Sequence, residues 1–237
     1  MGVCLCRLLK GHCNLTICSR SYPKARAAAK VLGINGSEVD KCAADCDILI
    51  AAVPTEDLQT FAKNVSRLMK EKSLFVDISS VKCGVIEPIL SVLPAFVEYT
   101  SIHPLFASTK VSPKNMIYMQ IRSPSMGSRF KWLLSVSGMR VTEATPEKHD
   151  KIMAAVQVLN HFAYLTLRNA LRECDYGPSM EPFLTHAFSR TLASLKLIEN
   201  NMDTIKLIQK LNKYAPHARN IFISEAKKLN DEFNKRN

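Results

Sequence analysis

The sequence predicts an α/β protein, in which a doubly wound parallel sheet over residues 1–144 is followed by an all-helical domain over residues 145–237. Three observations predict this class. Short β-rich runs alternate with helical stretches as far as residue 144, as in a parallel sheet with helical crossovers. Several runs, such as residues 48–53, are continuously apolar, which is typical of a strand covered by helices on both faces. No strand-like run follows residue 145.

Six runs have the composition of strands. In chain order they are residues 14–18, 47–53, 74–77, 97–102, 115–121 and 140–143. Helical stretches between them cover residues 22–32, 56–70 and 84–92, and residues 3–9 also have a helical pattern. At Thr145 and Pro146, an N-cap residue and a proline at the first helical position begin the second domain. Breaks at Gly177-Pro178 and Ala215-Pro216 divide that domain into helical sections.

Composition and charge narrow the class of function. Hydrophobic residues make up 47% and charged residues 22%, which is typical of a folded globular chain. No apolar run approaches the roughly 20 residues of a membrane helix, so no membrane partner is expected. The net charge is +11, and the basic residues are spread along a chain with only 7% aromatic residues. This distribution favours a small polyanionic substrate and a phosphorylated cofactor over nucleic acid.

The eight cysteines indicate the redox environment. They form no C-x-x-C pair, so the sequence predicts neither a zinc site nor any other metal centre. Reduced thiols and the lack of a signal-peptide pattern together predict a cytoplasmic protein.

The beginning of the chain predicts a Rossmann-like dinucleotide site. Gly2 lies ahead of the strand-like run that leads to Arg20. This is the position that the third glycine of a G-x-G-x-x-G loop would occupy. We therefore expect that Met1 is not the natural start and that the first strand and first two glycines lie upstream. The end of the run carries Ser19, Arg20 and Ser21 and no carboxylate. Hydroxyls and a guanidinium suit a 2′-phosphate, so NADP is favoured over NAD.

The carboxyl ends of the later strands supply further candidates, because ligands of such sheets bind there. Val53 and Pro54 end one strand, where the chain is expected to pass beneath the nucleotide, and Asp77 ends the next. Ser80 and His103 follow strands that are consecutive in the chain, so we expect both at one cleft. His103 is the candidate base, and a buried structural histidine is the alternative reading.

Three segments together resemble the signatures of the prephenate and arogenate dehydrogenases. They are Asp77-Ile-Ser-Ser-Val-Lys82, His103-Pro-Leu-Phe-Ala107 and Glu147-Lys-His-Asp150. Arg190 and residues 205–212 are similar to further elements of that family. Two positions depart from it: Ala107 stands where a glycine is common, and Val158 stands where a second histidine precedes His161.

The resemblance implies oxidative decarboxylation of prephenate or arogenate with hydride transfer to NADP, a step of tyrosine biosynthesis. It implies that His103 deprotonates the ring hydroxyl and that Ser80 orients His103 or the hydroxyl. Arg190, His161 and Lys82 are implied to bind the small dicarboxylate substrate. A homodimer formed through the helical domain is the implied assembly.

Two alternative functions stay open from the sequence. One is another NAD(P)-dependent reductase or dehydrogenase with a helical dimer domain, and the other is a catalytically silent relative, which the incomplete glycine loop suggests. The choice between prephenate and arogenate also stays open, as does a fused chorismate mutase upstream of Met1.

Overall fold

The chain divides into two units, Met1–Pro146 and Glu147–Asn237. The described strands lie in the first unit, where they form two sheets. The computed structural model describes residues 1–175 and 177–235. One sheet pairs β1 with β2, and the other has the strand order β3-β4-β5-β6-β7. The strands are β1 Thr16–Cys18, β2 Asn35–Ser37, β3 Ile48–Ala51, β4 Leu74–Asp77, β5 Glu98–Pro104, β6 Asn115–Arg122 and β7 Arg140–Glu143. The predicted doubly wound α/β class is confirmed.

The larger sheet is mixed, whereas the sequence predicts a parallel one. β5 and β6 run antiparallel because residues 105–114 join them without a helix that would carry the chain back to the starting end. The other neighbouring strands are joined through helices and are parallel. Among the described residues, β1 and β3 each pair with one strand only, so each has an open edge.

Helices cover both faces of the five-stranded sheet. In β4, Leu74 and Val76 belong to an apolar cluster that includes residues of α1 and α6, while Phe75 belongs to a cluster with residues of α4 and α5. All three side chains are fully buried, which explains why the run does not alternate between apolar and polar residues. The helices of this unit are α1 Gly2–Leu9, α2 Tyr22–Leu32, α3 Val39–Asp45, η1 Thr55–Asp57, α4 Leu58–Ser66, α5 Ile86–Leu90 and α6 Met126–Val136.

The structure contains two elements between α2 and β3 that the sequence did not predict, the strand β2 and the helix α3. β2 has the sequence Asn-Gly-Ser and no apolar side chain, so nothing local indicates a strand, and only its parallel pairing with β1 defines it. α3 has seven residues, too few for a helical period to be recognised. The helix predicted over residues 56–70 begins as the 3₁₀ turn η1, and α4 ends at Ser66.

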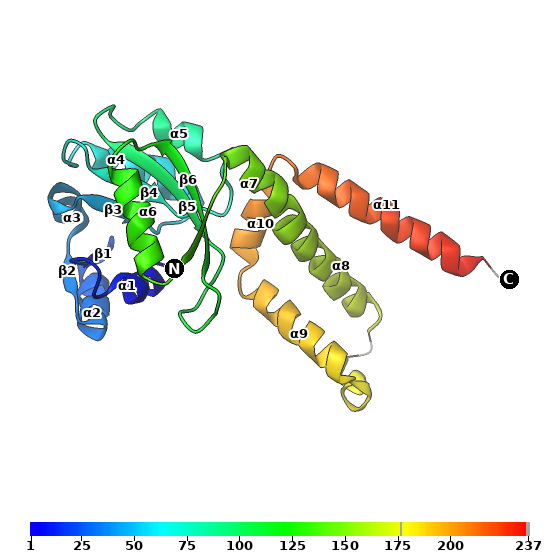
Figure 1. Ribbon diagram of the computed structural model, residues 1–237. Coiled ribbons are helices and arrows are strands. Elements are labelled where there is room, and N and C mark those ends of the chain that lie inside the picture. The colour runs from blue at the N-terminus through cyan, green and yellow to red at the C-terminus, as the bar shows by residue number, and fades with distance from the viewer. Residues whose placement is uncertain (176, 236–237) are drawn as a thin grey trace. The chain divides into compact units, whose positions relative to one another are not determined.

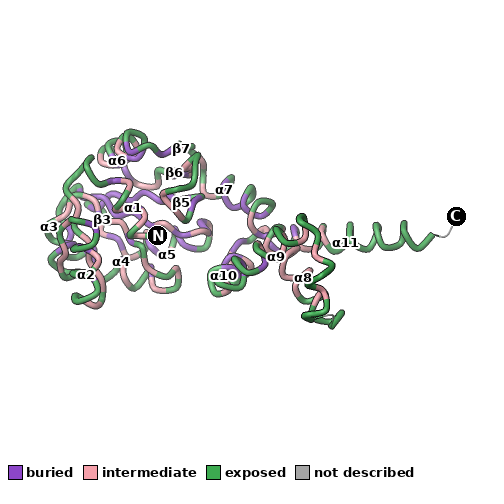
Figure 2. The backbone as a smooth tube through the Cα atoms, turned by 90° about the horizontal axis from the view of Figure 1, so that it is seen from below, coloured by how far each residue is buried: buried purple, intermediate pink, exposed green. Residues whose placement is uncertain are grey.

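Helices alone form the second unit in the residues that the structure describes. They are α7 Pro146–Met153, η2 Ala154–Leu159, α8 Asn160–Glu173, η3 Gly177–Phe183, α9 His186–Glu199, α10 Met202–Leu211 and α11 Ala215–Asn234. α8 and α9 lie side by side as a hairpin (Figure 1). The second half of α11 is exposed along its length (Figure 2). None of the described helices combines the length and the apolar character needed to cross a bilayer.

The segment η2 is a π-helix that joins α7 to α8. The Gln209 side chain donates a hydrogen bond from Nε2 to the Val158 carbonyl at 2.8 Å, which gives a carbonyl of the wide turn a partner outside the helix. Arg219 in turn donates to the Gln209 side-chain oxygen at 3.0 Å. Single π turns occur often at functional sites, so the residues of this turn are candidates for a ligand contact.

Candidate active site

The carboxyl end of β5 carries His103. β4 pairs with β5 only as far as Asp77, which lies opposite Ser101, so the last residues of β5 project beyond β4. His103 lies on this projection, remains paired with β6 and is 4% exposed. Ser80 follows β4 by three residues and is half-buried. Because β4 and β5 are parallel neighbours, the fold places both candidates at the carboxyl end of the sheet.

The Lys82 side chain lies in the interior of the first unit and is fully buried. Its Nζ donates to Asp77 Oδ1 at 3.1 Å, to Ser79 Oγ at 3.2 Å and to the Ile102 carbonyl at 2.8 Å. Asp77 is equally buried, and its Oδ2 accepts a hydrogen bond from the Tyr99 hydroxyl at 2.8 Å. Both side chains are fully buried and paired with each other in this structure. The substrate contact of Lys82 and the cofactor contact of Asp77 therefore stay predictions.

This network fixes the charge states of its members. Burial by itself raises the pKa of Asp77, but the Lys82 ammonium and the hydrogen bonds from Ser79 outweigh it and hold the pKa below its usual value. Burial and then the adjacent Asp77 carboxylate raise the pKa of Tyr99 far above its ordinary value. At neutral pH, Asp77 is a carboxylate and Tyr99 is a neutral hydrogen-bond donor.

Gly2 begins α1 and lies against the end of β3. A Cβ atom at position 2 would lie 3.2 Å from Cβ of Ala52, so a larger residue would push the helix away from the strand end. Val53 and Pro54 follow directly and are half-buried and exposed, respectively. The structure thus brings Gly2 next to the segment that carries Val53 and Pro54, although the two segments are far apart in the sequence. The N–H groups at the start of α1 suit a phosphate there.

Arg20 has an acidic neighbour that the sequence analysis missed. Its Nη1 lies 3.7 Å from Oδ2 of Asp57, and the Arg20 side chain is 86% exposed. Asp57 belongs to η1, just beyond β3, so only the fold brings this carboxylate to the end of β1. Ser19 Oγ accepts a hydrogen bond from the Ser21 N–H at 3.3 Å, and the Ser21 side chain does not cap α2.

In the helical unit, two buried polar atoms lie one turn apart around the end of η2. His161 Nδ1 and Gln157 Oε1 have no hydrogen-bond partner among the described residues. Burial lowers the pKa of His161, so its ring is neutral at pH 7. Buried polar atoms normally have partners, which makes both residues candidates for a ligand contact. Gln157 is a second residue that the sequence analysis missed, because an isolated glutamine matches no motif.

Arg190 lies on α9 and is exposed. Its guanidinium makes no ion pair with any residue of the described ranges, so it is available to a carboxylate. Within those ranges, no group of three or more His, Cys, Asp or Glu side chains is arranged to hold a metal ion.

Comparison with known proteins assigns both units. The family model described as the nucleotide-binding domain of prephenate dehydrogenase matches residues 5–117, and the model of its dimerization domain matches residues 145–237. The chain belongs to the prephenate dehydrogenase family. A curated relative, the "Probable arogenate/prephenate dehydrogenase" of Methanocaldococcus jannaschii, is 26% identical over 242 residues, which cover 98% of this chain and 54% of the relative. The chain therefore spans about half the length of that relative.

Solved structures of the family share the fold. The arogenate dehydrogenase of Synechocystis superposes with a TM-score of 0.77 at 14% identity, covering 96% of this chain and 86% of that one. The prephenate dehydrogenase of Aquifex aeolicus, in complex with hydroxyphenyl propionate and NAD+, gives a TM-score of 0.66 at 19% identity and covers 98% and 91%. At these identities the similarity establishes the architecture.

One family-like segment has a structural role in the dimerization domain. His149 Nδ1 lies 2.8 Å from Asp150 Oδ1, and both side chains are buried. The Asp150 carbonyl accepts a hydrogen bond from Nδ2 of Asn212 at 2.9 Å. These contacts tie α7 to the junction of α10 and α11, and therefore contribute to the fold of the domain.

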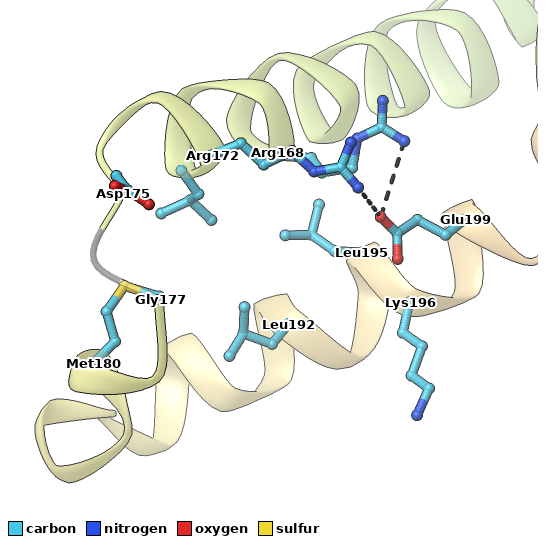
Figure 3. Close-up of a pocket in the computed structure, with 10 residues that line it drawn as sticks. Arg168, Arg172, Asp175, Gly177, Met180, Leu192, Leu195, Lys196 and Glu199 are labelled. Carbon is cyan, nitrogen blue, oxygen red and sulfur yellow. Dashed lines mark hydrogen bonds and ion pairs between the residues drawn. The ribbon is translucent and has the colours of Figure 1, made fainter.

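A hollow of about 510 Å³ opens between α8 and α9 of the dimerization domain (Figure 3). Its lining includes Leu171, Leu192 and Leu195. Arg168 and Arg172 both reach Glu199, at 3.9 and 3.1 Å, so a large part of the charge in the hollow is paired internally. Neither Arg190 nor His161 lines it, so the hollow is separate from the candidate substrate residues.

Proposed function

We propose that this protein oxidises and decarboxylates prephenate or arogenate in the cytoplasm, with NADP as hydride acceptor. The supporting observation is the placement of His103 on the projecting end of β5, with Ser80 at the same edge of the sheet. His103 accepts the proton of the ring hydroxyl as hydride leaves the same carbon. A carbonyl forms at that carbon, the bond from the ring to its carboxylate breaks, and carbon dioxide departs. The electron pair of that bond makes the ring aromatic, and the resulting phenolate takes a proton back from His103 to become the phenol. Ser80 orients His103 or the hydroxyl.

The residues at the ends of β1 and β3 fit a dinucleotide. Gly2 permits close approach of the α1 terminus to the β3 end, where Val53 and Pro54 lie. We assign the 2′-phosphate to Arg20 and the nearby hydroxyls of Ser19 and Ser21, because a guanidinium and hydroxyls suit a phosphate dianion. When bound, NADP supplies the acceptor for the hydride.

The cofactor preference predicts opposite effects for two variants. Arg20→Ala should weaken NADP binding by about tenfold and leave NAD nearly unchanged, because an exposed charge-assisted contact to the phosphate is lost. Asp57→Asn should strengthen NADP binding, because it releases Arg20 from a competing carboxylate. Titration of each variant with both cofactors measures this. Equal losses for NADP and NAD in Arg20→Ala would remove Arg20 from the phosphate site.

For the substrate, we assign Arg190 to one carboxylate by a bidentate contact. We assign substrate contacts to His161 and Gln157 through the two atoms that have no partner among the described residues, because buried polar atoms are normally hydrogen-bonded. An absorbance assay of NADPH formation with prephenate and with arogenate tests the function and separates the two substrates. Absence of NADPH with both, despite NADP binding, would instead support a catalytically silent relative.

We assign the homodimer interface to the dimerization domain, with a second copy covering its exposed apolar surface. Large apolar side chains stand in solvent on the second half of α11, including Leu229 at 52% and Phe233 at 81% exposure. They lie four residues apart and therefore on one face of the helix. The hollow between α8 and α9, which leucines and charged side chains line together, is a further surface that a second copy can fill.

The double variant Leu229→Glu/Phe233→Glu should dissociate the dimer, because it would bury two carboxylates without partners in the interface. Sedimentation velocity measures the change from twice the chain mass to one. Val31→Glu is the matched control, since Val31 is 79% exposed on α2 of the other unit. A double variant that stays dimeric would move the interface away from α11.

A further inference from the structure

A buried polar network lies behind the projecting end of β5. It consists of Asp77, Ser79, Lys82 and Tyr99, whose residues are at most 5% exposed. The ion pair at its centre joins Lys82 Nζ to Asp77 Oδ1 at 3.1 Å. Fully buried lysines are rare, and a buried ion pair is often no more stabilising than apolar residues of the same volume. A gain in folding stability is therefore a weak explanation for the network. The alternative explanation is that the network holds a neighbouring part of the chain in position.

The network ends on the peptide group that precedes His103. Lys82 Nζ donates to the Ile102 carbonyl at 2.8 Å, so it restrains the peptide plane between Ile102 and His103. This is the region in which β5 lacks a strand partner on one side, because pairing with β4 stops at Ser101. On the other side, β6 still pairs with β5. The Lys82 ammonium thus takes the place of the missing strand and holds the projection from the β4 side.

The rest of the network holds Lys82. Asp77 Oδ1 accepts from Lys82 Nζ, and Asp77 Oδ2 accepts from the Tyr99 hydroxyl at 2.8 Å. Tyr99 itself lies on β5, four residues before His103. The carboxylate is therefore fixed at both oxygens, and its position determines where the ammonium meets the Ile102 carbonyl.

We propose that Tyr99, Asp77 and Lys82 are positioning residues that set the orientation of His103 through the Ile102 carbonyl. The inference rests on the proposed role of His103 as the base. All three side chains are buried. They keep the imidazole aligned with the substrate hydroxyl, and misalignment of about 1 Å at a reacting group is enough to cost about 100-fold in rate.

The test compares two tyrosine variants that each lose one buried hydroxyl. Tyr99→Phe removes the donor to Asp77 and should lower kcat about tenfold, the kinetic equivalent of one charge-assisted hydrogen bond, with the substrate KM within about twofold. Tyr118→Phe is the matched control, because Tyr118 is also buried but its hydroxyl faces Thr100 at 3.3 Å, outside the network. It should leave kcat unchanged.

A second measurement does not depend on turnover. In nitrogen-15 NMR spectra of the full chain, the ring signals of His103 are assigned by their disappearance in His103→Asn. They should shift in Tyr99→Phe and stay in place in Tyr118→Phe. Unchanged ring signals and kcat in Tyr99→Phe, with only a lower melting temperature, would overturn the proposal. If the parent chain turns over neither substrate, the proposed function fails, and the ring signals still decide whether the network orients His103.

Discussion

His103→Asn should abolish most turnover while leaving the fold and the affinity for NADP intact. General-base catalysis contributes typically about 10²- to 10⁴-fold, so kcat should fall by that factor, since asparagine cannot accept the hydroxyl proton. Steady-state kinetics with saturating NADP measures the loss.

A second buried histidine provides the control for this variant. His149→Leu removes the buried contact with Asp150 in the dimerization domain, so it should lower the melting temperature without changing the rate constant of the folded enzyme. If His103→Asn behaves in the same way, His103 is a structural histidine. The role of base would then have to be sought at Ser80 or His161.

Among the variants described, Lys82→Met should cause the largest decrease in the free energy of unfolding. It leaves the Asp77 carboxylate buried without its counter-charge, and removing one partner of a buried ion pair typically costs about 3–5 kcal/mol. Chemical denaturation at pH 7 measures the change in the free energy of unfolding. Lys131→Met is the matched control, because Lys131 pairs with Glu143 at the surface of the same unit and should change stability little.

The loss from Lys82→Met should also depend on pH. In the parent, the pKa of Asp77 is lower in the folded than in the unfolded chain, so its stabilisation is present above the ordinary aspartate pKa and is lost as pH falls through the folded value. In the variant, burial raises the pKa of Asp77, so acid neutralises the unpaired carboxylate. The difference in unfolding free energy between parent and variant should therefore shrink toward acid pH. A difference that grows would contradict a charged Asp77 in the folded parent.

Local patterns determined the elements whose signals lie within one segment. The strands β4 Leu74–Asp77 and β7 Arg140–Glu143 and the helix α2 Tyr22–Leu32 have the predicted bounds. Continuous apolar runs indicated strands buried on both faces, and the proline at the first position of α7 marked where the helical half begins. The alternation of these elements was enough to predict the α/β class, because crossover helices force parallel pairing.

Tertiary structure alone decided the partners of the charged side chains. From the sequence, Lys82 is one of several basic residues near a candidate site. Its burial depends on Asp77, Tyr99 and the Ile102 carbonyl, which come from three parts of two strands. A local pattern encodes backbone preference and the apolar face of an element, but it carries no information on which distant polar group will lie opposite.

The same limit applies at the cofactor and substrate ends. Asp57 reaches Arg20 only because η1 follows the end of β3. Gln157 is singled out only because its buried side-chain oxygen has no partner in the part of the chain that the structure describes. The sequence by itself thus determined the fold class, the family resemblance and the candidate base. The tertiary structure decided which candidates are exposed to ligands and which are buried, because burial and pairing depend on contacts between segments far apart in the chain.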